Sequence, residues 1–150
     1  MIGDVIVIST KGRYALRVMI DIAVYSNGEF ISLKDISKRE EISLKYLEQV
    51  ISVLNRANLV QSLRGNNGGY RLSKEPKDYT AGEILRAAEG TLCSVQCLVN
   101  SNYECPHLQI CSTIDFWKGF DKFVDDYVNS VTLDKLANDY REKIGNDYSI

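Results

Sequence analysis

A chain of 150 residues is long enough for one well-buried core and leaves little room for a second independent domain. Hydrophobic residues make up 45% and charged residues 25% of it, as in ordinary water-soluble globular proteins. No apolar run approaches the roughly 20 residues that a membrane span requires, so we expect no membrane partner. The net charge is −2, but residues 1–75 carry 11 Lys and Arg against 8 Asp and Glu, whereas residues 76–150 carry 7 against 12. A basic front half and an acidic rear half suit a local contact with nucleic acid.

The first eight residues form a short apolar extension. They lack a basic lead and contain Asp4, so a signal peptide is not expected. The chain should therefore lie in the reducing cytoplasm, where thiols more often serve metal or redox chemistry than structural disulfides. This gives weight to the four cysteines of the sequence.

Three capped helices are predicted before residue 58. Ser9 or Thr10 can cap a first helix that ends near Tyr25, and Ser32 can cap a short helix that ends near Arg39. Ser43 can cap a longer helix that ends near residue 57. Its apolar spacing predicts a buried stripe, which consists of Leu44, Leu47, Val50, Ile51 and Leu54. Two helices joined by a tight turn are the pattern of a helix-turn-helix.

A basic hairpin is predicted directly after these helices. Residues 59–64 alternate like a strand, residues 65–69 form a glycine-rich turn, and residues 70–73 form the return strand. Such a hairpin is the wing of a winged helix, whose arginines can reach the phosphate backbone or the minor groove. An ordinary surface hairpin is the alternative interpretation.

A long amphipathic helix is predicted over residues 113–130. Its apolar side chains recur every three or four residues, namely Trp117, Phe120, Val124, Tyr127 and Val128, followed by Val131. A chain of this size has little else to bury so broad a stripe, which favours a partner helix. Packing against the winged-helix body of the same chain is the alternative.

Several motifs, in matching order and spacing, resemble the IscR/NsrR/CymR-type winged helix-turn-helix transcription regulators. They lie at residues 8–17, 42–49, 59–60, 64–72, 80–85, 89–90 and 131–136, so the resemblance covers residues 8–137. The chain departs from the family pattern at Asn66 and Asn67, where the family usually has Pro-Gly, and in the six or seven residues before the usual start.

The resemblance implies a set of DNA-contacting residues. Those near the start of the second helix of the motif would face the major groove, namely Ser43, Lys45, Tyr46 and Gln49. Gln49 can form a pair of hydrogen bonds with adenine, and Lys45 can reach guanine or phosphate. For Tyr46 the alternative role is packing within the protein. The wing would contribute Arg64, Gly65, Gly68 and Arg71, and Lys11 and Arg13 would lie near backbone phosphates.

The resemblance also implies a sensor, because the spacing of Cys97, Cys105 and Cys111 is similar to the three-cysteine loop of the cluster-binding branch of the family. Thiolates are the usual protein ligands of iron–sulfur clusters, and the spacing matches no common paired zinc pattern. We expect a [2Fe–2S] rather than a [4Fe–4S] cluster.

The fourth ligand is open. The family places either a histidine or an acidic residue there, and Ile114 and Arg13 occupy those positions here. The remaining candidates are Cys93, His107, Glu104 and, more distantly, Asp115. The alternative for Cys93 is that it is simply a small apolar residue, and the alternative for His107 is that it is a plain surface residue.

The expected fold is mainly α with a small β-hairpin wing, a winged helix-turn-helix plus a long dimerisation helix. The expected segments are an extension (1–8), the DNA-binding region (9–79), a linker helix with the cysteine loop (80–112), the dimerisation helix with its return segment (113–137) and a tail (138–150).

The expected function is that of a homodimeric regulator, a repressor, of a palindromic operator on double-stranded DNA, controlled by the cluster. Alternatives are a cluster-free thiol switch, a zinc-binding regulator, or a regulator controlled by a metabolic enzyme as partner. An enzyme is not expected, because the chain has one histidine and residues 65–69 lack the lysine and following helix of a phosphate-binding loop.

Overall fold

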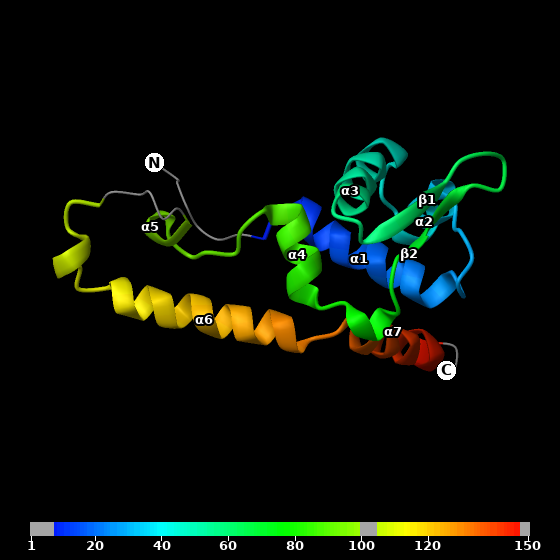
Figure 1. Cartoon of the computed structure of the whole chain (residues 1–150). Coiled ribbons are helices and arrows are strands. Elements are labelled where there is room, and N and C mark those ends of the chain that lie inside the picture. Colours follow the sequence, from blue (N-terminus) through cyan, green and yellow to red (C-terminus); the bar gives the residue numbers. More distant parts are fainter. Residues whose placement is uncertain (1–7, 100–104, 148–150) are drawn as a thin grey trace.

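The computed structural model describes residues 8–99 and 105–147, and they form a winged-helix body with a long arm (Figure 1). The body contains α1 (Thr10–Tyr25), α2 (Leu33–Glu40), α3 (Leu44–Arg56), β1 (Val60–Leu63), β2 (Gly69–Leu72), the short η1 (Pro76–Asp78) and α4 (Ala81–Glu89). The arm contains α5 (Gln96–Val99), η2 (Leu108–Ile110) and α6 (Ile114–Ser130), after which α7 (Leu133–Asp147) returns to the body. The predicted fold class, mainly α with a small hairpin wing, is confirmed.

Serine caps start the three helices of the body. The hydroxyl of Ser9 accepts from the backbone N–H of Gly12, and Ser32 and Ser43 do the same one turn into α2 and α3. Each bond satisfies a donor that the helix itself leaves unpaired. The predicted caps therefore agree with the structure.

The apolar faces of these helices make the core, with Val18, Ile22, Ile36, Leu47 and Leu54 fully buried. The prediction for Leu44 is wrong, since 39% of this side chain is exposed. Leu44 is the first residue of α3, and the buried residues of this helix begin one turn later, at Leu47.

The wing is a two-stranded antiparallel hairpin that is also paired to the chain before α2. Val60 lies opposite Leu72 and Leu63 opposite Gly69. Ile31 exchanges two backbone hydrogen bonds with Tyr70, 2.9 and 2.8 Å long. A Cβ atom at Gly69 would lie 2.1 Å from the carbonyl oxygen of Ile31, so glycine is required for this close approach.

Tyr79 fixes the base of the wing. Its side chain is fully buried, and its hydroxyl donates to the carbonyl of Leu59 (2.6 Å) while accepting from the N–H groups of Ser73 and Lys74. One phenol thus satisfies three backbone groups at the point where both strands meet the body.

The arm joins the body through α4 and α6. A Cβ atom at Gly82 of α4 would lie 2.9 Å from a methyl group of Val128, so glycine lets the two helices approach closely. Arg86 adds polar contacts from α4 to Asp125 and Asn129 of α6. Beyond these contacts α6 extends away from the body, and the cysteine-bearing segments lie at its far end (Figure 1).

The last helix, α7, lies along α1 and is longer than the sequence pattern suggests. Leu133 and Ala137 are fully buried, and Arg141 donates to the carbonyl of Ala23. Residues 138–147, expected as a tail, are thus the second half of a packed helix. Among residues 8–99 and 105–147, none of the helices has the length and apolar character to cross a membrane.

Candidate nucleic-acid interface and cysteine segment

Helix α3 presents polar side chains outward while its other face is held by the core. Ser43, Lys45 and Gln49 are exposed. Leu47 and Val50, between and beside them in sequence, are fully buried. Since the burial of several large apolar side chains fixes the rotation of a helix, the outward face of α3 is well defined.

Tyr46 has a structural contact within the chain. It is half-buried, and its ring packs edge-on against Tyr14 of α1 with ring centroids 5.5 Å apart. The packing alternative for Tyr46 thus has direct support, and its contact with DNA stays a prediction.

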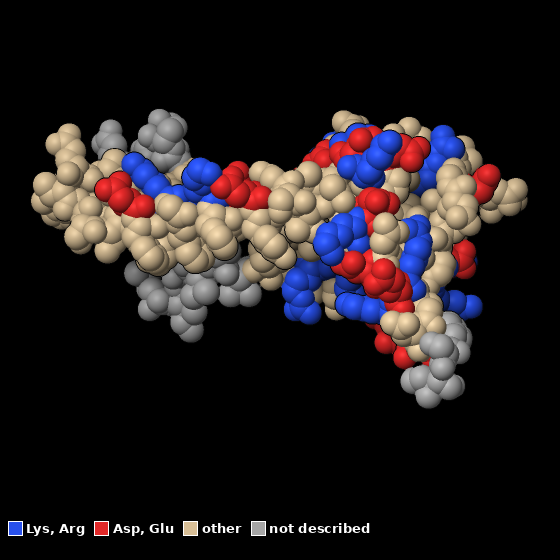
Figure 2. All heavy atoms as spheres, turned by 90° about the horizontal axis from the view of Figure 1, so that it is seen from below, with Lys and Arg blue, Asp and Glu red and all other residues tan. Residues whose placement is uncertain are grey.

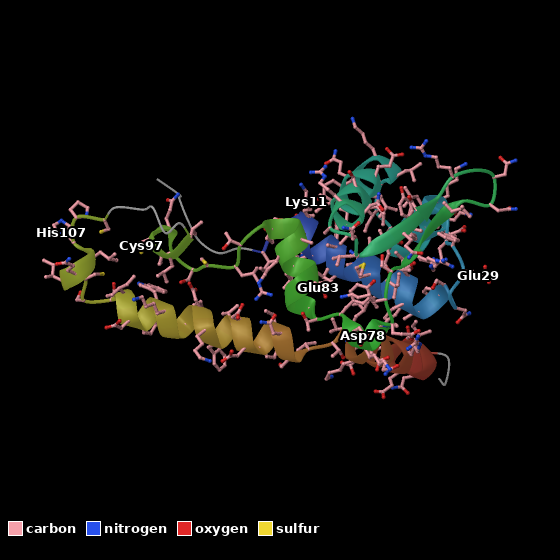
Figure 3. The ribbon with its side chains drawn as sticks, viewed as in Figure 1. Lys11, Glu29, Asp78, Glu83, Cys97 and His107 are labelled. Carbon is pink, nitrogen blue, oxygen red and sulfur yellow. The ribbon has the colours of Figure 1, made fainter. Side chains whose placement is uncertain are left out.

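The start of α1 is tied to the end of α4. The carboxylate of Glu89 accepts from the backbone N–H and the hydroxyl of Ser9, at 2.9 and 2.6 Å. A Cβ atom on buried Gly12 would lie 2.2 Å from this carboxylate. On the same first turn Arg13 is exposed and Lys11 is half-buried, and Figure 3 shows Lys11 at this end of α1.

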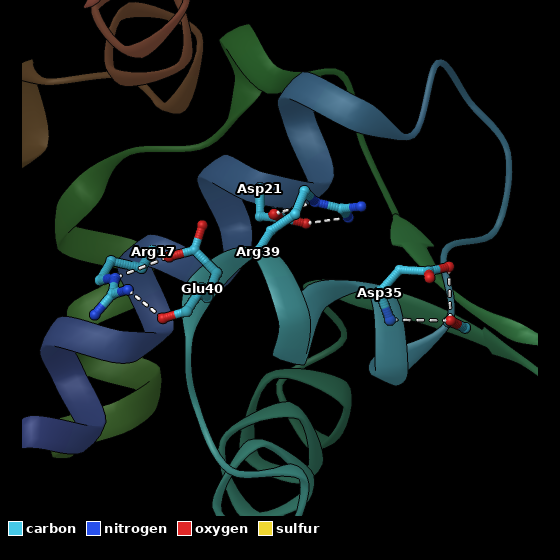
Figure 4. Close-up of polar contacts among 6 residues, drawn as sticks. Arg17, Asp21, Asp35, Arg39 and Glu40 are labelled. Atoms are coloured by element: carbon cyan, nitrogen blue, oxygen red, sulfur yellow. Dashed lines mark hydrogen bonds and ion pairs between the residues drawn. The ribbon is translucent and has the colours of Figure 1, made fainter. Parts of the chain in front are cut away.

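Arg17 of α1 and Arg39 of α2 each form an ion pair within the body (Figure 4). Arg39 binds the fully buried carboxylate of Asp21 through two hydrogen bonds of 2.7 and 2.8 Å. Arg17 binds the carboxylate and the backbone carbonyl of Glu40. Burial raises the pKa of the Glu40 carboxyl, and the hydrogen bond from Arg17 opposes this shift. These arginines position α1 against α2 and are engaged within the body.

The two wing arginines differ in their surroundings. Arg64 is exposed, whereas Arg71 donates to the side chain of Gln61 (3.0 Å) and to the carbonyl of Gly28 (3.3 Å). The guanidinium of Arg71 also lies 4.5 Å from the centre of the Phe30 ring. The sequence grouped the two arginines as equivalent flanks of the wing, and the structure separates them.

The turn of the wing depends on its glycines. Gly65 has φ +114°, a conformation that L side chains rarely adopt. The N–H of Gly68 donates to the carbonyl of Gly65 over 3.0 Å and closes the turn.

The structure does not bring Cys97, Cys105 and Cys111 together. Cys97 lies on α5, and the other two lie on either side of η2; all three are partly exposed. Within residues 8–99 and 105–147 the His, Cys, Asp and Glu side chains form no group of three that could hold a metal ion. The described arrangement therefore does not fit an iron–sulfur cluster. Figure 3 shows Cys97 and His107 at the end of the arm that is remote from the wing.

The candidate fourth ligands are equally dispersed. The thiol of Cys93 contacts the carbonyl oxygen of Leu98 at 3.6 Å, and His107 and Asp115 are exposed. Glu104 lies outside the described residues.

Cys111 is distinguished by its electrostatics. Hydrogen bonding from the backbone N–H and the hydroxyl of Thr113 lowers the pKa of its thiol. A lower thiol pKa means more thiolate at neutral pH, and thiolate is both the nucleophile and the metal ligand.

An aromatic stripe runs along the outer face of α6. It consists of Phe116, Phe120, Phe123 and Tyr127, which are 64%, 44%, 75% and 64% exposed. Their spacing of four, three and four residues places them on one face of the helix. Figure 2 shows broad uncharged surface on the arm, whereas charges of both signs are mixed over the body.

The predicted interface residues only partly coincide with this stripe. Phe120 and Tyr127 belong to it, whereas Trp117 and Val124 are half-buried and Val128 is buried against α4. The same chain already covers the side chain of Val128, and its place in a dimer interface stays a prediction. Phe116 and Phe123 were missed, although their spacing from Phe120 and Tyr127 carried the signal.

Comparison with known proteins decides the family. A family model described as "Rrf2: Iron-dependent Transcriptional regulator" matches residues 8–139. The chain belongs to the Rrf2 family. It is similar to an HTH-type transcriptional regulator of Neisseria meningitidis serogroup A, with 41% identity over 86% of either chain.

Two solved structures of transcription regulators are also similar to it. CymR, the global cysteine regulator of B. subtilis, shares 39% identity with a TM-score of 0.71, and the match covers 87% of this chain and 95% of CymR. IscR of T. potens shares 36% identity with a TM-score of 0.71, over 90% and 88% of the two chains. The predicted relationship to IscR- and CymR-type regulators is confirmed, and the Rrf2 chain is a DNA-binding transcription regulator rather than an enzyme.

Proposed function

We propose that this Rrf2 protein binds a palindromic operator on double-stranded DNA as a homodimer and represses transcription from it. Its affinity for the operator would change in response to a signal received by the cysteine segment, the part of the arm that carries Cys93, Cys97, Cys105 and Cys111. The observation that carries the proposal is the anchoring of α3. Its apolar side chains from Leu47 to Leu54 are buried, while Ser43, Lys45 and Gln49 remain exposed beside the wing. As a DNA-binding regulator it would act in the cytoplasm, the location expected from the sequence.

The part of the body that would contact DNA, the reading head, consists of the start of α1, helix α3 and the wing. Lys45 and Gln49 carry the donors and acceptors that suit guanine and adenine in the major groove. Lys11 and Arg13 at the start of α1, and Arg64 on the wing, would neutralise phosphates.

Dimerisation would use the aromatic stripe of α6. Four aromatic side chains exposed on one helix face are more apolar surface than a monomeric protein usually leaves in water. A second copy packed on this stripe would relate two reading heads by a twofold axis, as a palindrome requires.

Two kinds of signal are compatible with the cysteines of the arm. Three cysteines in one segment and the iron-dependent description of the family support an iron–sulfur cluster, with the [2Fe–2S] type as our expectation. The dispersed thiols support a cluster-free thiol switch, with Cys111 as its reactive member. Control by a metabolic enzyme as partner stays a further alternative.

DNA binding is tested by titrating a labelled operator, selected from a random pool, at several salt concentrations. Each phosphate contact should steepen the fall of affinity with salt. Lys45→Ala and Gln49→Ala should each weaken specific binding by about 1–3 kcal/mol. Lys135→Ala, on α7 at the opposite side of the body from α3 (Figure 1), is the matched control and should bind as the unchanged protein does. Equal affinity of the α3 variants and the control would contradict the proposal.

The cluster is tested by anaerobic purification with analysis of iron, sulfide and visible absorbance. Single Ala variants of Cys97, Cys105 and Cys111 should lose iron, since each removes a thiolate that would hold it. Cys93→Ala, the control, should keep it unless Cys93 is the fourth ligand. Full retention of iron in the Cys105 and Cys111 variants would rule out the cluster and leave the thiol switch.

A further inference from the structure

Of the two wing arginines, only one is free of contacts within the described part of the protein. Arg71 is held by Gln61, by the carbonyl of Gly28 and by the face of the Phe30 ring. To reach DNA, its guanidinium would have to give up these contacts. Within the described wing, residues 60–72, this leaves Arg64 as the cation available at the tip.

What the tip offers instead is a pair of amides. Asn66 and Asn67 follow Arg64 in the turn, and both side chains are exposed. Within the described part of the chain, neither side chain makes a hydrogen bond to the protein, so their donors and acceptors are available to a partner. Figure 1 shows the β1–β2 turn projecting at the edge of the body, beyond the strands.

Backbone contacts fix the turn that carries these two asparagines. The N–H of Gly68 closes the turn onto the carbonyl of Gly65 at 3.0 Å. A Cβ atom at Gly68 would lie 2.2 Å from the carbonyl oxygen of Leu63, so the two arms of the turn are in close contact. The amides are thus presented on a closed turn whose strands are paired to the body through Ile31.

We infer that Asn66 and Asn67 are specificity determinants, which read base edges in the minor groove beside the bases that α3 reads. The inference rests on the proposed DNA-binding function and deepens it. An amide NH2 can donate to adenine N3 or thymine O2, the acceptors that A·T pairs present in the minor groove, and the N2 amino group of guanine blocks this approach. The wing therefore selects A·T pairs at the flank of the operator.

Charge distinguishes this role from a phosphate contact. A neutral amide releases no condensed counterion, so a base-reading Asn changes sequence preference without changing the salt dependence of binding. A cation on a phosphate does the reverse: it strengthens binding to all sequences and steepens the salt dependence.

The test uses the full-length protein and a selected operator in which the flanking A·T pairs are replaced by G·C or by inosine·C. Inosine lacks the N2 amino group, so inosine·C resembles G·C in the major groove and A·T in the minor groove. The unchanged protein should lose roughly 5- to 100-fold in affinity per G·C replacement and regain it with inosine·C. The Asn66→Ala/Asn67→Ala double variant should bind A·T and G·C flanks equally, with an unchanged salt slope.

Arg64→Ala is the matched control on the same turn. It should weaken binding to every flank and reduce the salt slope by about one. Both asparagines have negative φ, so alanine fits the same backbone, and circular dichroism verifies the fold of the double variant.

Three results would overturn the inference. One is flank discrimination that survives in the double variant, and another is a uniform loss at all flanks, which indicates a phosphate contact. A third is failure of inosine·C to restore affinity, which places the discrimination in the major groove. Absence of any sequence-specific binding by the unchanged protein would instead overturn the proposed function itself.

Discussion

At the scale of single residues, Tyr79 illustrates how one side chain can hold several elements. Its hydroxyl serves the carbonyl of Leu59 and the N–H groups of Ser73 and Lys74, all where the wing joins the body. Tyr79→Phe keeps the buried ring and removes only the oxygen. Because it removes all three hydrogen bonds of a buried hydroxyl, we expect a loss of about 2 kcal/mol in the free energy of unfolding, measured with urea.

The control for this change is Tyr127→Phe. It removes a hydroxyl from a side chain that is 64% exposed, and we expect little effect on stability. If the two variants unfold at the same urea concentration, the hydroxyl of Tyr79 does not stabilise the fold as argued.

Cys111 gives a prediction about pH. The N–H of Thr113 stabilises its thiolate, so the thiol pKa lies below its ordinary value and the thiolate population rises at lower pH than for a free thiol. In a variant with Cys93, Cys97 and Cys105 replaced by Ser, the rate of iodoacetamide alkylation should show its pH midpoint below that of a simple alkyl thiol. Thr113→Val, which removes only the hydroxyl contact, should shift the midpoint part of the way back. A midpoint at or above the ordinary value would contradict the assignment.

At the scale of elements, the end of α2 contains a strained residue. Glu41 has φ 54° and ψ 39°, the left-handed conformation that costs an L side chain roughly 1–2 kcal/mol. Glycine adopts it without this cost but loses more chain entropy on folding. We therefore expect Glu41→Gly to raise the free energy of unfolding by about 0.5–1 kcal/mol.

The same substitution at Glu75, where φ is −63°, is the control for Glu41→Gly. It should give no gain, because glycine there only adds entropy to the unfolded chain. Thermal unfolding of the two variants should therefore move in different directions, and a parallel shift would show that backbone strain at Glu41 is not the cause.

The elements were predictable from the sequence wherever their signals are local. Ser9, Ser32 and Ser43 each cap a helix by accepting a hydrogen bond from the N–H three residues later, and glycines mark the turn of the wing. α7 was missed because its buried contacts are few, Leu133 and Ala137, so its polar sequence resembles that of a tail.

The candidate site was less predictable, because its geometry depends on distant partners. Arg71 is withdrawn from the wing by Gly28, which lies 43 residues earlier in the chain. No local pattern reports such a contact. Val128 likewise fits a stripe for a partner helix, and only the approach of α4 at Gly82 shows that the same chain buries it.

At the scale of the whole molecule, a continuous set of contacts links the cysteine segment to the reading head. The N–H of Ser94, next to Cys93, donates to Asp121 of α6 at 2.8 Å, and Asp125 of the same helix binds Arg86 of α4. Glu89 at the end of α4 then caps α1 through Ser9. A signal at the cysteines can alter DNA affinity only if its two states favour different arrangements of these contacts. The polar links between α4 and α6 are the first place to look for that difference.

The proposed dimer depends on the aromatic stripe of α6. One substitution in this stripe can disrupt the dimer without disrupting the fold of the monomer. Phe123 is 75% exposed in the single chain, so Phe123→Asp should leave the folded monomer intact. In a dimer packed on the stripe it would place a charge in an apolar seam, which is costly without a partner. Sedimentation at micromolar concentration should therefore show a dimer for the unchanged protein and a monomer for the variant.

Lys118→Asp is the control for this change, since Lys118 is exposed on the same helix, two positions from both Phe116 and Phe120 and thus facing away from them. It should stay dimeric. DNA adds a second readout: the Phe123 variant should lose affinity for the full palindrome while binding a single half-site as the unchanged protein does. If the unchanged protein sediments as a monomer, the stripe serves another purpose. A dimer that survives Phe123→Asp would place the interface elsewhere on the chain, and the twofold relation of the reading heads would then need a different origin.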